Sequence, residues 1–176
     1  MPRQTQNPEP VAKPESAPRT LFEQVGIWLE ANDWRYSENA ERGYYSLQVE
    51  CDPGTVRMII DTDEKEGSNF LLVYVTYPVR VPEARRQAVM ELITRTNHQM
   101  KVGNFEMDFG DGEICFRVSL DLVGQDFTDD SIERVFTYSL RTGNRLYAPL
   151  LSVAFGEVSA SVALERMSAP ANVVLQ

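Results

Sequence analysis

Cysteine and histidine are scarce in this chain: its 176 residues include two cysteines and one histidine. Cys51 and Cys115 form no C-x-x-C pair, and His98 stands alone, so zinc-binding and thiol-exchange motifs are excluded. No segment approaches the roughly 18 apolar residues of a membrane-spanning helix. The first residues contain no apolar run, so we expect no secretory signal before the domain. We therefore expect a cytoplasmic protein with free thiols and no membrane partner.

Positive charge is scarce too. Seventeen lysines and arginines oppose 26 aspartates and glutamates, which gives a formal net charge of −9. Within residues 1–18, Arg3 and Lys13 balance Glu9 and Glu15, so the excess lies on the rest of the chain. An acidic domain repels nucleic acid and anionic lipid at long range. The charge therefore predicts that nucleic acid is not a partner.

Recognisable reaction motifs are missing as well. The chain has no P-loop, no G-x-G-x-x-G after a predicted strand, no H-E-x-x-H and no G-x-S-x-G. A dyad of Cys115 and His98 needs a spatial adjacency that the sequence does not show. We expect no catalytic residue, no cofactor and no metal ion. An enzyme that uses Cys115 or paired carboxylates is the least favoured hypothesis.

Acidic residues gather in two places. The first cluster fails the EF-hand spacing, which needs glycine and glutamate where Glu66 and Leu72 stand. The glycines around the second cluster are explained by turn geometry. We interpret both as solvated charge, and a small-ligand or metal-ion sensor remains the alternative function. The clusters comprise Asp61, Asp63, Glu64 and Glu66, and then Asp108, Asp111 and Glu113.

Proline is concentrated at the start, where residues 1–18 hold five of the ten prolines and few apolar residues. This composition predicts a disordered tail. Residues 19–167 are predicted to form a single domain, because a hydrophobic content of 43% over this length supports one core. Residues 168–176 are predicted to fray.

The first half of the domain is predicted to be one helix and three strands. Thr20 and Glu23 have the spacing of a capping box, so a helix begins there and ends near Asn32. Apolar patterns then predict three strands with a polar loop before the last of them, which Pro78 ends. The strands are expected at residues 44–51, 55–61 and 70–76, with the loop at 62–69.

The second half begins with a helix that starts at Pro82 and that Gly103 closes. Residues 104–109 and 113–122 alternate apolar with polar side chains around a Gly-Asp-Gly turn, which predicts a hairpin.

Asp129 opens a third helix, in which Ser139 and Gly143 let the helix lie close to a sheet, and residues 158–167 follow as a short helix. The order α-β-β-β-α-β-β-α predicts an α+β fold, with an antiparallel sheet that carries its helices mainly on one face.

Residues 81–122, VPEARRQAVMELITRTNHQMKVGNFEMDFGDGEICFRVSLDL, carry a family resemblance. The Val-Pro helix start, Asn97 near the helix end, Gly103 before a strand and the acidic turn resemble the YbjN-like family of bacterial sensory-transduction regulators. The resemblance runs from Trp28 to about Gly156. It implies a fold similar to that of type III secretion chaperones, and a homodimer that holds a partner polypeptide. It transfers no functional residue.

These observations together predict a non-catalytic protein-binding module, chaperone-like or a regulatory adaptor. A polar sheet face and exposed strand edges can hold a partner protein whose identity the sequence does not give. Four strand residues are the candidate partner-binding side chains: Arg57, Ile59, Arg117 and Ser119.

Overall fold

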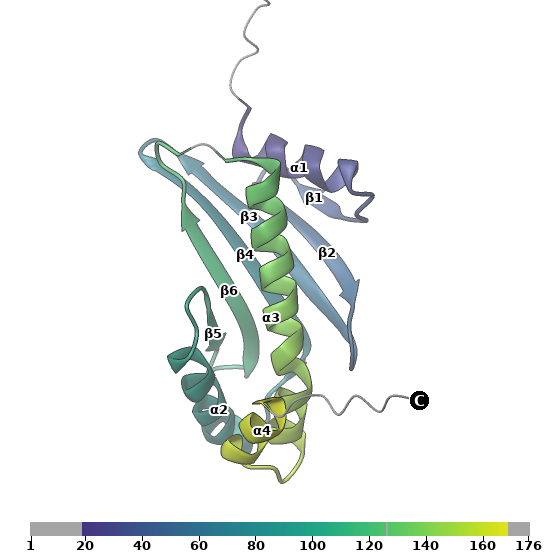
Figure 1. Ribbon diagram of the computed structural model, residues 1–176, viewed down its shortest axis with the longest axis vertical. Helices are drawn as coiled ribbons and strands as arrows, with labels where there is room; N and C mark the ends of the chain where they lie inside the picture. Colours follow the sequence, from purple (N-terminus) through teal and green to yellow (C-terminus); the bar gives the residue numbers. More distant parts are fainter. Residues whose placement is uncertain (1–18, 126, 169–176) are drawn as a thin grey trace, which may run out of the picture.

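The computed structural model describes residues 19–125 and 127–168 (Figure 1). The predicted tail at 1–18, and all of the predicted tail at 168–176 except Ser168, lie outside these residues. The helices are α1 (Leu21–Ala31), the 3₁₀ turn η1 (Glu83–Arg85), α2 (Arg86–His98), α3 (Asp129–Phe155) and α4 (Ala160–Ser168). The strands are β1 (Ser37–Asn39), β2 (Tyr44–Glu50), β3 (Thr55–Lys65), β4 (Ser68–Arg80), β5 (Asn104–Met107) and β6 (Glu113–Asp121).

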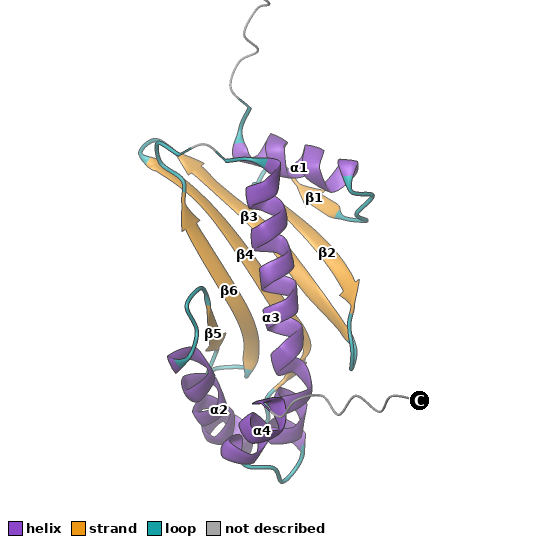
Figure 2. Ribbon diagram, in the orientation of Figure 1, coloured by secondary structure: helices purple, strands orange, loops and turns teal. Residues whose placement is uncertain are grey.

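The six strands form one antiparallel sheet in the order β1-β2-β3-β4-β6-β5 (Figure 2). The predicted α+β class and the antiparallel sheet are therefore confirmed. The predicted order of elements is right apart from one additional strand, β1. Its residues, Ser37, Glu38 and Asn39, contain no apolar side chain, so no hydrophobic pattern marks them.

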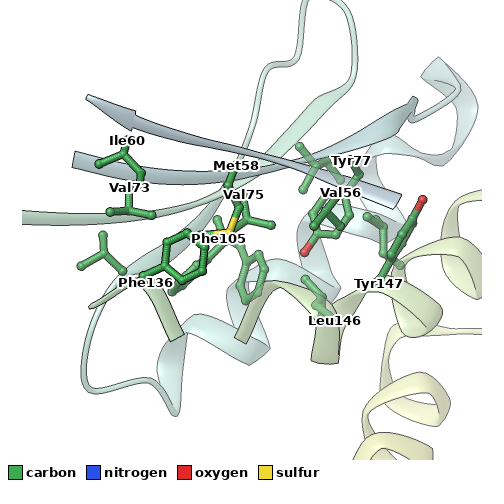
Figure 3. Packing of buried hydrophobic residues seen from close by; sticks show 14 of the residues in the cluster. Val56, Met58, Ile60, Val73, Val75, Tyr77, Phe105, Phe136, Leu146 and Tyr147 are labelled. Carbon is green, nitrogen blue, oxygen red and sulfur yellow. The ribbon is translucent and has the colours of Figure 1, made fainter. Parts of the chain in front are cut away.

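The helices pack on the apolar face of the sheet, where α3 lies across the strands (Figures 1 and 3). The α3 residues that face the sheet are buried, among them Phe136, Gly143 and Tyr147. A Cβ atom on Gly143 would lie 2.7 Å from Cγ1 of Val75 in β4, so the helix rests directly on the sheet there. The predicted close approach at this glycine is confirmed.

Capping fixes the start of the first and third helices. The Thr20 hydroxyl accepts from the backbone N–H of Glu23, whose carboxylate accepts from the N–H of Thr20, and this confirms the predicted capping box. Thr128 caps α3 in the same way, through the N–H of Ser131. Helix α1 ends at its C-cap Asn32, as predicted, and α3 ends before Gly156.

Two predicted boundaries in the first half are wrong. Residues 62–69 are not a polar loop: β3 continues to Lys65, β4 begins at Ser68, and Gly67 turns the chain with a φ of 78°. Pro78 does not end β4, which continues to Arg80. A register shift between Thr76 and Arg80 accommodates the proline, which is exposed and has no N–H to pair.

The predicted end of the second helix, at Gly103, is also wrong. The helix finishes at His98, and Gly103 lies five residues later, where it begins the approach to β5. Its φ of 70° and its packing against Phe116 require glycine for the turn into the strand rather than for a helix cap. The predicted hairpin of β5 and β6 is confirmed, although Phe109 lies exposed beyond the end of β5.

Candidate functional site: the open face of the sheet

The sheet has a second face that none of the described helices covers. Side chains alternate along each strand, so the neighbours of every core residue point to this face. On β3, Val56, Met58 and Ile60 are buried in the core, whereas the residues between them are half-buried or exposed. We call this surface the open face. Its central side chains are Arg57, Ile59, Asp61, Leu72, Tyr74, Thr76, Cys115, Arg117 and Ser119.

All four candidate partner-binding residues lie on the open face. Arg57 and Ile59 are on β3, and Arg117 and Ser119 are on β6, with β4 between them. Tyr74 of β4 pairs with Ile59 on one side and with Arg117 on the other, so the three form one row across the sheet. The structure thus brings the four residues to one surface, and whether they bind a partner remains a prediction.

Sequence reasoning missed the two β4 residues at the centre of this surface, Leu72 and Tyr74. The run from Phe70 to Thr76 is nearly all apolar, which is typical of a strand covered on both faces. In the structure its odd-numbered residues are buried and its even-numbered residues are half-buried on the open face. The sequence did carry a signal for these residues, because the run is apolar at positions on both faces of the strand and only one face packs in the core.

Charged groups surround the apolar centre. The Arg117 guanidinium pairs with the Glu106 carboxylate at 2.5 Å, and Arg57 Nε donates to Ser46 Oγ at 2.8 Å. Burial raises the pKa of Tyr74, and the Arg117 guanidinium acts in the opposite direction. Among the described residues, Nε of Arg117 is buried without a hydrogen-bond partner. An acceptor from a docked partner would satisfy this group.

The acidic part of the open face lies at the other end of the same strands. Burial raises the pKa of Asp61 above its usual range, and the nearby Asp63 carboxylate raises it further, while Lys65 acts against them. A hollow of about 690 Å³ opens here, beside the start of α1. Its lining includes Asp61, Glu64 and Leu72. A cationic group of a partner would be favoured at this end.

Side chains of both acidic clusters make hydrogen bonds and ion pairs within the fold. The Glu64 carboxylate accepts from the backbone N–H groups of Leu21 at 2.7 Å and Phe22 at 3.1 Å, at the start of α1. Asp63 pairs with Lys65 at 2.6 Å. Within residues 19–125 and 127–168, no group of three or more His, Cys, Asp or Glu side chains is placed to hold a metal ion.

At the β5–β6 turn, Asp108 accepts from the N–H of Gly110, and Asp111 accepts from the N–H of Glu113. Arg80 pairs with both Asp111 and Glu113, each at 3.2 Å. Because the backbone N–H of Glu113 and the Arg80 guanidinium favour its charged form, the pKa of Asp111 is lowered. Turn geometry and one arginine therefore account for this cluster.

Cys115 does not have the character of a nucleophile. Burial raises its pKa to about 11, and the Glu106 and Glu113 carboxylates contribute in the same direction. Its Sγ contacts Glu106 Oε2 at 4.0 Å, and the hydrogen bonds of the described residues include none between Cys115 and His98. A thiolate is the reactive form of cysteine, and this site disfavours it.

A family model described as "YbjN: Putative bacterial sensory transduction regulator" matches residues 22–152. One solved structure, described as the crystal structure of YbjN, a putative transcription regulator from E. coli, aligns with a TM-score of 0.40 at 12% identity, over 73% of this chain and 86% of that one. No curated protein matches the chain. No helix in the described part of the chain has the length and apolar character to cross a membrane.

Proposed function

The chain belongs to the YbjN family, and from this premise we propose that it is a cytoplasmic regulator that binds another protein and catalyses no reaction. The open face carries the proposal, since it is a broad surface with an apolar centre that no described element covers. Large uncovered patches of this kind are typical of interaction sites.

The composition of the open face favours a protein over a small molecule. Tyrosine and arginine are enriched at the centres of protein interfaces, and here Tyr74 lies directly between Ile59 and Arg117. Thr76 and Ser119 lie beside this row on the same face and would add polar contacts to it. A small ligand is held in a concave site, and the row of Ile59, Tyr74 and Arg117 lies outside the hollow that Asp61 and Leu72 line.

Charge indicates what the partner presents. Asp61 and Asp63 lie at one end of the face, and the chain outside residues 1–18 carries the whole net charge of −9. A partner surface with an apolar centre and basic groups opposite these aspartates would complement both features. We therefore commit to a basic protein surface as the occupant, in preference to a second copy of this acidic chain.

The proposal that the protein is not an enzyme has its own support. Cys115 is held as a thiol, Glu64 caps a helix, and Asp111 and Glu113 pair with Arg80. Glu64, Asp111 and Glu113 are thus occupied in structural contacts, and Cys115 is disfavoured as a nucleophile.

Affinity purification of the full chain, followed by mass spectrometry, tests the proposal. Ile59→Glu places a charge at the apolar centre, and Thr94→Glu places the same charge on an exposed position of α2 as a control. The proposal predicts a stoichiometric partner with wild type and Thr94→Glu, and its loss with Ile59→Glu. Recovery of only a second copy of the chain, measured by light scattering, would contradict the proposed partner and identify a homodimer.

A further inference from the structure

Strand β2 has one edge that is only half covered. β1 pairs with β2 through Tyr44, Tyr45 and Ser46, and β3 pairs with the whole length of β2 on its other side. No strand in the described part of the chain therefore lies beside the outer edge of residues 47–50. In Figure 1 this is the lower half of β2, at the margin of the sheet away from β6.

Backbone hydrogen bonds show which groups point outward from this edge. The N–H of Cys51 donates to the carbonyl of Gly54, and the carbonyl of Gly43 accepts from the N–H of Thr62. Odd-numbered residues of β2 thus bond toward β3. Since bonding direction alternates along an antiparallel strand, the N–H and C=O groups of Gln48 and Glu50 point away from the sheet. They form a template for another strand.

Helix α3 reaches the β2–β3 turn, at the end of this edge. Leu140, Asn144, Tyr147 and Leu151 recur at helical spacing and share one stripe. Tyr147 lies against the β2–β3 turn, because a Cβ on Gly54 would be 3.1 Å from its Oη. Leu140, Asn144 and Leu151 are half-buried, as is Val49 of β2. A strand added beside β2 would find the apolar side chain of Val49 on the core side of the sheet.

One hydrogen-bond acceptor of this α3 stripe is unsatisfied. Among the residues that the structure describes, Oδ1 of Asn144 is buried and has no hydrogen-bond partner. A buried polar atom without a partner is costly, and an incoming donor removes the cost. Among the described residues, the outward backbone groups of Gln48 and Glu50 thus have no neighbouring strand, and Asn144 Oδ1 has no donor.

We propose that residues 47–50 of β2 take an extended segment of the partner protein as an added strand, an inference that rests on the proposed function. Main-chain bonds to Gln48 and Glu50 hold the segment, and its alternate side chains meet Val49. Glu50 and Asp52 favour basic residues in the segment. A second copy of β2 would bring the same acids together, so self-pairing is disfavoured.

A phage-displayed library of random dodecapeptides, selected on the full chain, provides the probe. Gln48→Pro removes an outward N–H without breaking a bond to β3, and Gln48→Thr changes the side chain but keeps the N–H. We expect selected peptides that alternate basic and apolar residues. Their binding should fall about tenfold in Gln48→Pro and hold in Gln48→Thr. Circular dichroism and thermal unfolding verify that both variants fold.

Hydrogen exchange on the wild-type chain gives a second readout. Bound peptide should slow exchange at the amides of Gln48 and Glu50, and leave that of Asp121 on β6 unchanged. Peptides that bind without slowing those two amides, or a library that yields no binder, would overturn the inference. If the cellular partner binds Gln48→Pro normally but is lost with Ile59→Glu, strand addition fails and the proposed function stands. If wild type recovers no partner, the proposed function fails.

Discussion

The hydroxyl of Tyr77 donates a 2.7 Å hydrogen bond to the backbone carbonyl of Gly143, which ties the centre of the sheet to the middle of α3. Burial raises the pKa of this tyrosine above its usual range, so the hydroxyl is a donor throughout the neutral pH range. The contact joins α3 to the core face of the sheet. The opposite face is left uncovered by the described helices.

Gly143→Ala is expected to destabilise the protein although alanine favours helix. Its Cβ would lie 2.7 Å from Val75 Cγ1 in a packed core, and overpacking of this kind costs about 1–3 kcal/mol. Against this, alanine gains roughly 1 kcal/mol of helix propensity. Urea unfolding measures the balance, with exposed Arg141→Ala as the control. A Gly143→Ala variant more stable than wild type would contradict the close seating of α3.

Asn97→Asp should destabilise the junction of α2 and β5. The Asn97 amide accepts from the N–H of Phe105 at 2.8 Å and donates to its carbonyl at 2.9 Å. Aspartate keeps the acceptor but sets a second oxygen against that carbonyl, a loss of about 1–3 kcal/mol. The deficit should shrink in acid, where protonation restores a donor. His98→Ala, at the exposed neighbouring position, is the control and should change the free energy of unfolding by less than about 0.5 kcal/mol. Urea unfolding of both variants measures the difference.

Glu64→Gln should weaken the start of α1. The carboxylate accepts two N–H groups there and its charge suits the positive end of the helix dipole, so we expect a loss of about 0.5–2 kcal/mol. Glu66→Gln, in the exposed turn between β3 and β4, is the matched control. Equal effects of the two variants in thermal unfolding would show that Glu64 does not act as a cap.

Cys115 should alkylate slowly near neutral pH. Its pKa of about 11 lies roughly two units above that of an ordinary thiol, so below pH 9 its thiolate population is about 100-fold smaller. Because the thiolate reacts, the rate should rise steadily as the pH increases from 8 to 10. Iodoacetamide labelling of a Cys51→Ser variant, followed by mass spectrometry, measures it. Fast labelling at pH 7 would indicate an activated thiol and revive the enzyme hypothesis.

Elements with local signals were predictable from the sequence. Three patterns are local in the sequence, because each is formed by residues of the element that it predicts. They are the capping box at Thr20, the alternation around Gly112 and the apolar stripe of α3. Long-range contacts were not. Thr62 lies in β3, where it pairs with Leu71 of β4 and donates both its N–H and its hydroxyl to the carbonyl of Gly43, 19 residues away. The polar sequence around Thr62 does not indicate these pairings.

The candidate site was predictable in part for the same reason. Alternation along each strand placed Arg57 with Ile59 and Arg117 with Ser119. It could not show that β4 joins the two pairs through Tyr74, because strand order is a tertiary property. The half-covered edge of β2 was equally out of reach, since β1 has no apolar pattern to reveal how little of β2 it protects.

Site-specific photocrosslinking in living cells tests the central claim, that the open face binds another protein, most directly. A photoreactive amino acid replaces Ile59 at the centre of the face or, as the control, exposed Thr94 on α2. The account predicts one discrete adduct with a different protein from position 59 and none from position 94. No adduct at position 59, or the same adducts from both positions, would contradict it.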